Sequence, residues 1–270
     1  MLMFVILFMN TIKTGIFMFI SLIIFIVCTI SGVLTGLLGI GGGLVIVPMF
    51  MTVLPFLGVD LLTTHQIVAV STTCVFFNSA TTAFYRRKEQ FIDKKLLILL
   101  SVFIILGTVS GSYISSFAPD KLIFIVYFFV CLLSLYLFNK TVFFDLQNSK
   151  FKYLIYLIFT LIGALSSIIG IGGAVFFATA LRCFVESDTK KLLPSITFLV
   201  FVHASFAFFS KLALGEVIYF IIPTAIIASL IGSKIGTIIS RHVSTKVINI
   251  MMQAVLIFGL IRISVEFFKT

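Results

Sequence analysis

Residues 36–43 read GLLGIGGG, and residues 167–174 read SIIGIGGA. Each glycine-rich stretch follows a long apolar run and precedes another one. Because glycine weakens helices and accepts left-handed backbone, both stretches predict a break between two helices. In lipid, such a break frees backbone N–H and C=O groups, which is tolerated where the break is buried in protein or lines a cavity. Breaks in corresponding positions of two halves point to the binding site in transporters built from repeats.

The composition is that of a protein embedded in a membrane. Of the 270 residues, 61% are hydrophobic and 10% are charged, whereas a soluble domain has about 45–50% apolar and about 25% charged residues. The formal net charge of +10 comes from Lys and Arg residues that lie mostly between apolar runs, where they orient a membrane protein. We therefore predict a multi-pass protein of the cell membrane, inner or plasma, with no nucleic-acid partner.

Other features argue against several kinds of site. The N-terminal stretch MLMFVILFMN has neither a basic region nor a small-residue cleavage site, so a cleaved signal peptide is not expected. The four cysteines are scattered without a C-x-x-C pair, so we expect neither a disulfide nor a metal site. The glycines do not form a dinucleotide fingerprint, because no strand precedes them and no acidic ribose ligand follows. We expect no cofactor and no catalytic residues.

Ten apolar segments predict an all-α integral membrane fold. A membrane-spanning helix needs about 20 apolar residues. The expected segments lie near residues 14–38, 44–54, 65–85, 95–117, 121–139, 152–169, 174–184, 192–210, 216–240 and 246–268. The second and the seventh are short, which predicts half-length or tilted helices beside the glycine breaks.

The two halves of the chain align with each other. The glycines of the first break match those of the second at an offset of 131 residues, and Gly107 and Gly111 match Gly232 and Gly236 at an offset of 125. An odd number of segments in each half would make the second half enter the membrane inverted. The predicted units are a first transmembrane repeat over residues 1–139, a linker over 140–151 and a second repeat over 152–270.

The basic residues between the segments favour this inverted arrangement. If all ten segments cross, thirteen Lys and Arg residues lie on one side and four on the other; if the two short segments do not cross, the division is eleven to six. The first division agrees better with the excess of Lys and Arg in cytoplasmic loops, although eight or ten crossings remain open. The thirteen residues are Arg86, Arg87, Lys88, Lys94, Lys95, Lys140, Lys150, Lys152, Arg182, Lys190, Lys191, Arg241 and Lys246.

The glycines have two possible uses. Consecutive glycines at a helix start expose N–H groups at the positive end of the helix dipole, which suits an anion. Small residues also permit close helix packing. Packing accounts for Gly32 with Gly36, Gly107 with Gly111, and Gly232 with Gly236. The denser glycines are assigned to the anion site: Gly39, Gly41, Gly42, Gly43, Gly170, Gly172 and Gly173.

Polar residues within the apolar segments complete the candidate substrate site. They are Ser71, Thr72, Asn78, Thr197 and His203. Buried Ser and Thr often bond back to their own helix, whereas Asn and His indicate an interior face. His203 is a candidate for proton coupling, because imidazole titrates near neutral pH; a neutral hydrogen-bonding role is the alternative. Lys234 is a second coupling candidate, with snorkelling to the interface as the alternative. Lys211, which matches Arg86, is expected at the interface with it.

The duplicated G-x-x-G-I-G-G breaks resemble those of the TauE/SafE sulfite exporter family, and the resemblance covers about residues 15 to 265. It implies a permease for sulfur-containing or organic anions, including sulfite. The second half departs from the first, so the two half-sites are expected to be unequal. The departures are Ser167 for Gly36, Ala174 for Gly43 and Thr179 for Pro48.

These observations predict a transporter for a small anion that works by alternating access. The resemblance implies a sulfur-containing substrate, and proton coupling and the oligomeric state are left open. Two alternatives are an anion channel and an intramembrane enzyme. An enzyme would need a nucleophile–base pair, a metal set or paired carboxylates, and the sequence offers no such set.

Overall fold

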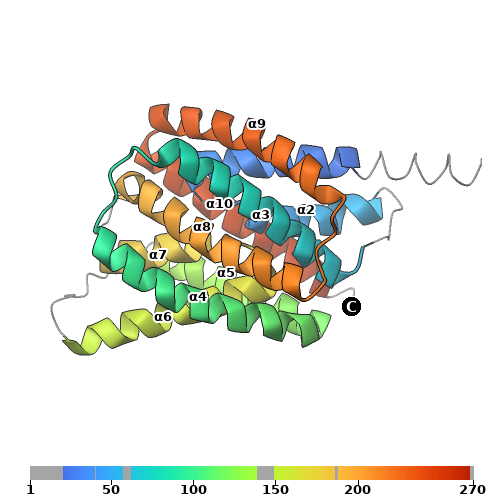
Figure 1. Cartoon of the computed structure of the whole chain (residues 1–270), viewed down its shortest axis with the longest axis horizontal. Coiled ribbons are helices and arrows are strands. Elements are labelled where there is room, and N and C mark those ends of the chain that lie inside the picture. Colours follow the sequence, from blue (N-terminus) through green and yellow to red (C-terminus); the bar gives the residue numbers. More distant parts are fainter. Residues whose placement is uncertain (1–20, 40, 57–61, 139–148, 186–187, 268–270) are drawn as a thin grey trace, which may run out of the picture.

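The computed structural model describes residues 21–39, 41–56, 62–138, 149–185 and 188–267, and within these ranges all regular structure is helical (Figure 1). The all-α prediction is thus confirmed. The N-terminal stretch considered as a signal peptide, Ile40 and most of the linker lie outside the described residues.

The helices follow the expected segments closely. They are the first helix (Ser21–Leu38), α2 (Gly43–Phe56), α3 (Thr64–Arg86), α4 (Lys94–Phe117), α5 (Asp120–Phe138), α6 (Ser149–Ile169), α7 (Ala174–Phe184), α8 (Thr189–Ala213), α9 (Ile221–His242) and α10 (Thr245–Phe267). The expected start of the ninth segment at residue 216 is wrong. Gly215, with φ of 73°, ends α8 in a left-handed turn, and the amide of Glu216 donates to the carbonyl of Lys211.

Seven of the described helices are long and apolar enough to span a membrane. Large hydrophobic side chains such as Ile98, Leu106 and Phe129 are exposed on the outside of the bundle. Such a surface is unfavourable in water and suits lipid. The chain is therefore a multi-pass integral membrane protein.

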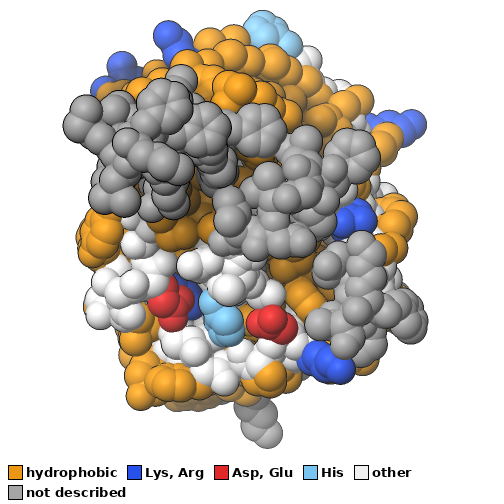
Figure 2. All heavy atoms as spheres, turned by 90° about the vertical axis from the view of Figure 1, so that its right-hand side faces the viewer, with side chains coloured by type: hydrophobic (Ala, Val, Ile, Leu, Met, Phe, Trp, Pro, Cys, Tyr) orange, Lys and Arg blue, Asp and Glu red, His pale blue; other side chains and the backbone are white. Residues whose placement is uncertain are grey.

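Contacts between loops and helix ends define the two ends of the bundle. At the first, which we call the basic end, Lys190 Nζ donates to the carbonyl of Arg241 at 3.1 Å, and Arg241 lies 3.7 Å from Glu89. At the opposite end, His65 lies 3.7 Å from Asp120. Figure 2 looks onto this opposite end, where acidic and histidine side chains lie in a patch of other side chains and backbone that hydrophobic side chains border.

Glycine pairs bring two pairs of helices into backbone contact. A Cβ atom on Gly236 of α9 would collide with the carbonyl oxygen of Val33 in the first helix, and one on Gly107 of α4 would collide with the carbonyl oxygen of Thr160 in α6. The packing role predicted for these glycines is confirmed. The two pairs lie on opposite sides of the bundle, with α3 and α8 between them (Figure 1).

Equivalent helices of the two halves make equivalent contacts. Helix α3 packs on α9 as α8 packs on α4, and α2 packs on α10 as α7 packs on α5. Each half thus contributes helices to the packing of the other. The long central helices α3 and α8 meet each other in the middle, and they position the glycine breaks described below.

The topology leads to a labelling prediction. Lys88 follows α3 at the basic end, and Ala213 ends α8 at the opposite end. In a cysteine-free background, Lys88→Cys should react with a membrane-impermeant maleimide from the cytoplasm, because Lys and Arg are retained there. Ala213→Cys should react only from the other side. Labelling of both positions from one side would contradict the inverted arrangement.

Candidate functional site at the paired glycine breaks

Both breaks contain three glycines in left-handed backbone. The φ angles are 71°, 69° and 74° at Gly39, Gly41 and Gly42, and 70°, 77° and 66° at Gly170, Gly172 and Gly173. Among the described residues, every positive φ belongs to a glycine. Side chains with a Cβ atom disfavour this conformation, so each break depends on its glycines.

The first helix and α6 end at the breaks, and the short helices begin there. The amide of Gly39 donates to the carbonyl of Thr35 at 2.8 Å, and the amide of Ile171 donates to the carbonyl of Ser166 at 3.2 Å. Helix α7 starts after Gly173, which offers no side-chain cap. Within the described part of the chain, the amides of Gly173 and Ala174 have no hydrogen-bond acceptor. Both amides lie at the positive end of α7.

The two breaks touch each other and the central helices. A Cβ atom on Gly43 would lie 2.5 Å from Cα of Ile171, so the backbones of the two breaks are in contact. Ser71 of α3 donates its hydroxyl to the carbonyl of Gly170 at 2.7 Å. Each break also lies against the opposite half of the chain. A Cβ atom on Gly39 would be 3.3 Å from the hydroxyl of Thr197, and a Cβ atom on Gly170 would be 3.3 Å from the hydroxyl of Thr72.

A narrow cavity lies beside the second break. It is lined by Thr72, Val75, Ser167, Gly170, Gly172, His203, Ala204 and Ala207. Four of the predicted site residues are therefore brought together in one place. The cavity is too narrow to admit a water molecule, so an oxyanion can enter only if the surrounding helices separate.

The predicted residues around the first break are also near one another, but they do not line this cavity. Asn78 donates from Nδ2 to Ser31 Oγ at 3.0 Å, and its Oδ1 has no partner within the described residues. A Cβ atom on Gly42 would collide with Ser31 Oγ. Ser31 thus occupies the space that a side chain at position 42 would need.

His203 holds the position in α8 that Asn78 holds in α3. Its Nε2 lies 2.9 Å from Ser166 Oγ and 3.3 Å from the carbonyl oxygen of Gly163. Because Ser166 already donates its hydroxyl to the carbonyl of Ile162, Nε2 carries the proton and Nδ1 holds a lone pair. Nδ1 has no partner among the described residues.

The hydroxyl protons of Thr72 and Thr197 are already in use. They bond to the carbonyls of Val68 and Leu193 in their own helices at 2.8 Å. The alternative weighed for these residues, back-bonding within the helix, is what the structure contains. Either threonine would have to rotate about χ1 before it could donate to an anion.

Lys234 does not join the site. Its side chain is exposed, on the face of α9 opposite the buried Gly232 and Gly236. This placement fits snorkelling from the outer surface of the bundle to the interface.

Arg86 and Lys211 lie at the ends of their helices, but their side chains are buried inside the bundle. Arg86 is only 3% exposed and Lys211 only 1%. Both are held by polar neighbours inside the bundle, which offsets the cost of burying their charge. The sequence does contain a signal for them, because Arg86 matches Lys211, and Ser240 matches Ser115, at the same offset of 125 residues.

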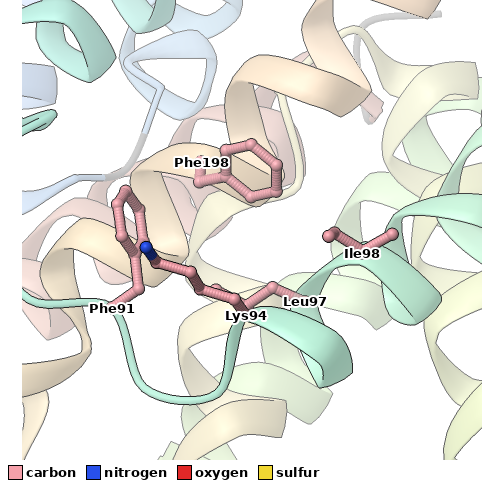
Figure 3. A pocket seen from close by; sticks show the side chains of 5 residues that line it. All are labelled: Phe91, Lys94, Leu97, Ile98 and Phe198. Atoms are coloured by element: carbon pink, nitrogen blue, oxygen red, sulfur yellow. The ribbon is translucent and has the colours of Figure 1, made fainter.

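A larger hollow of about 430 Å³ opens on the outside of the bundle (Figure 3). It is lined by Phe91, Lys94, Leu97, Ile98 and Phe198. Its walls are apolar apart from one lysine, and none of the predicted site residues lines it. The smaller cavity at the break is therefore the better candidate for anion chemistry.

Long apolar helices around buried, paired glycine breaks define an integral membrane protein of the transporter class. The family model described as "Sulfite exporter TauE/SafE" matches residues 24–263, so the chain belongs to this family. It is 25% identical over 251 residues to "Probable membrane transporter protein YunE" of Bacillus subtilis (strain 168), and the match covers 84% of this chain and 91% of that protein. No solved structure shows a significant match.

The break geometry leads to a mutational prediction. Gly173→Ala should reduce anion transport by at least about tenfold, because the added Cβ is strained at φ of 66° and would lie 2.8 Å from Ser166 Oγ. Gly215→Ala introduces similar strain at φ of 73° but meets no atom within 4 Å, so it measures the loss of membrane abundance that strain alone causes. Normal transport per molecule by Gly173→Ala would mean that the break only packs helices.

Proposed function

We propose that this chain transports a small sulfur-containing oxyanion such as sulfite by alternating access, with the anion bound between the two glycine breaks. The observation that carries the proposal is the cavity where Gly170, Gly172, Thr72 and His203 meet at the start of α7. The family description, "Sulfite exporter TauE/SafE", supports a sulfur oxyanion as the substrate.

The electrostatics of the breaks favour an anion over a cation. Helices α2 and α7 both begin at a break in the interior, so their positive ends lie there. The amides of Gly173 and Ala174 have no acceptor among the described residues, and they supply donors without a fixed positive charge. Such donors bind an oxyanion and release it without breaking a full ion pair.

The closed cavity favours a carrier over a channel. A channel needs a continuous open path, whereas the space beside the second break does not admit a water molecule. The exchange of contacts between the halves supports an inverted repeat, with residues 1–139 and 152–270 as the two units. Rocking of one unit against the other would expose the site to each side in turn. We place the basic end in the cytoplasm and the protein in the cell membrane.

His203 supports proton coupling by its position. It lines the cavity, and its Nδ1 has no partner among the described residues. A proton taken up at Nδ1 would add a donor and a positive charge beside the bound anion, so proton and anion would bind together. The phenyl ring of Phe177 packs edge-on against the imidazole at 5.9 Å between ring centroids.

Reconstitution in liposomes tests the proposed function. Purified protein should give saturable uptake of labelled sulfite. Unlabelled sulfite loaded inside the liposomes should accelerate this uptake (counterflow), because a carrier exchanges substrate across a single site. Flux that rises linearly with concentration and shows no counterflow would indicate a channel. Consumption of sulfite with a new chemical product would indicate an enzyme, and the absence of any oxyanion flux would contradict the proposal.

The same assay tests the role of His203. His203→Asn keeps hydrogen-bonding capacity at Nδ2 but cannot take up a proton near neutral pH. We expect this variant to bind sulfite within about threefold of the parent affinity, which corresponds to a change of less than about 1 kcal/mol in binding free energy. We also expect its uptake to lose the response to an imposed pH gradient. A pH response equal to that of the parent would assign His203 to structure.

A further inference from the structure

We propose that Arg86 and Lys211 are the two gate residues of the anion path, each closing one end by pairing with a nearby glutamate. The substrate anion opens a gate by replacing the glutamate carboxylate on the cation. This inference rests on the proposed anion transport and extends it to residues outside the glycine breaks.

Lys211 closes the end opposite to the basic end. It lies in the last turn of α8, and its Nζ forms an ion pair with Glu216 and donates to Ser115 Oγ at 3.2 Å. Ser115 donates in turn to the carbonyl of Ile168, directly before the second break. The ammonium group is thus connected through one hydroxyl to the end of α6.

Arg86 closes the basic end in a similar way. It is the last residue of α3, and its guanidinium donates to the carbonyl of Gly36 at 2.8 Å, to Ser240 Oγ at 2.6 Å and to Glu89 at 2.8 Å. Gly36 lies in the last turn of the first helix, directly before the first break. Each cation therefore binds the C-terminal end of a broken helix, Arg86 directly and Lys211 through a serine. The helix dipole favours positive charge at this end.

The two clusters correspond residue by residue. Arg86 and Lys211 are 125 residues apart, and so are their serine partners Ser115 and Ser240. The acidic partners are not at equivalent positions, since Glu89 follows Arg86 by three residues and Glu216 follows Lys211 by five. A carboxylate is thus supplied to each buried cation from a different place in the loop. Because both cations have a glutamate partner although the two glutamates are not at equivalent positions, we infer that the ion pair itself is required.

Lys211 lies on the face of α8 that lines the cavity, and Arg86 holds the equivalent position on α3. Ala204 and Ala207 line the cavity, and Lys211 follows them on the same face of α8 at the helical spacing of four residues. On α3, Ser79, Thr82 and Arg86 have the matching spacing. The cations therefore stand between the centre of the bundle and its two ends.

The chemistry of the pairs explains why they can open. A buried cation that loses its only counter-ion is strongly disfavoured, so a gate does not open by leaving its cation unpaired. An arriving oxyanion supplies equivalent acceptors, and the glutamate can then turn to the solvent, because Glu89 and Glu216 are only partly buried. Opening at one end is thus linked to the presence of substrate.

Site-directed labelling tests the gates without requiring transport. In a background with the four native cysteines replaced, Ala207→Cys reports on the path behind Lys211, and Thr82→Cys on the path behind Arg86. Glu216→Gln should raise impermeant-maleimide labelling of Ala207→Cys about tenfold from the Lys211 end, equal to about 1.4 kcal/mol of closure energy. Glu89→Gln should do the same for Thr82→Cys from the basic end.

Two controls separate gating from general loosening. Asp120→Asn removes the half-exposed His65–Asp120 contact at the same end as Glu216, and it should leave Ala207→Cys labelling unchanged. Glu216→Gln should not raise labelling of Thr82→Cys. Equal labelling in Glu216→Gln and Asp120→Asn, or a rise at both reporters, would overturn the proposal.

A second variant guards against a folding defect. Lys211→Arg keeps the cation and should keep Ala207→Cys protected, whereas Lys211→Met should expose it; protection in both would overturn the gate.

Failure of the proposed function is distinguishable from failure of the gates. Sulfite counterflow without any effect of Glu216→Gln on labelling would refute the gates alone, and gated labelling without oxyanion flux would refute the transport function alone.

Discussion

The backbone groups freed at two helix breaks have to be satisfied inside a bundle that lipid surrounds, and the rest of the structure depends on this constraint. Water is not available there, so the breaks are buried against each other and against the central helices. Gly43 touches Ile171 across the centre, and Ser71 satisfies the carbonyl of Gly170. Within the described residues, the amides of Gly173 and Ala174 at the start of α7 have no acceptor, and donors of this kind suit an anion.

Burying the breaks requires the outer helices to approach closely. The first helix meets α9, and α4 meets α6, through glycines whose backbones are in contact. These pairs enclose the breaks from two opposite sides of the bundle. Arg86 and Lys211 add polar links from the ends of α3 and α8 to the broken helices. The ends of α3 and α8 are therefore joined to the broken helices by short chains of hydrogen bonds.

Much of this architecture could be predicted from the sequence, because hydropathy and glycine spacing act locally. The apolar runs gave the helices within a few residues, and the glycine density separated the breaks from the packing pairs. The burial of Arg86 and Lys211 could not be predicted, because a charged residue at a helix end has the same local pattern whether it faces solvent or a serine from a distant helix. The late start of α9 was missed because the apolar residues after Glu216 resemble a continuing helix.

The central claim is that an oxyanion binds between the two glycine breaks, in the space beside the second one. Anomalous X-ray diffraction from crystals grown with selenite, which has the shape and charge of sulfite, tests it most directly. A selenium peak beside Gly172 and His203, in the space that both residues line, is the predicted result. A peak only in the outer hollow beside Lys94, or none at the break at saturating selenite, would contradict it.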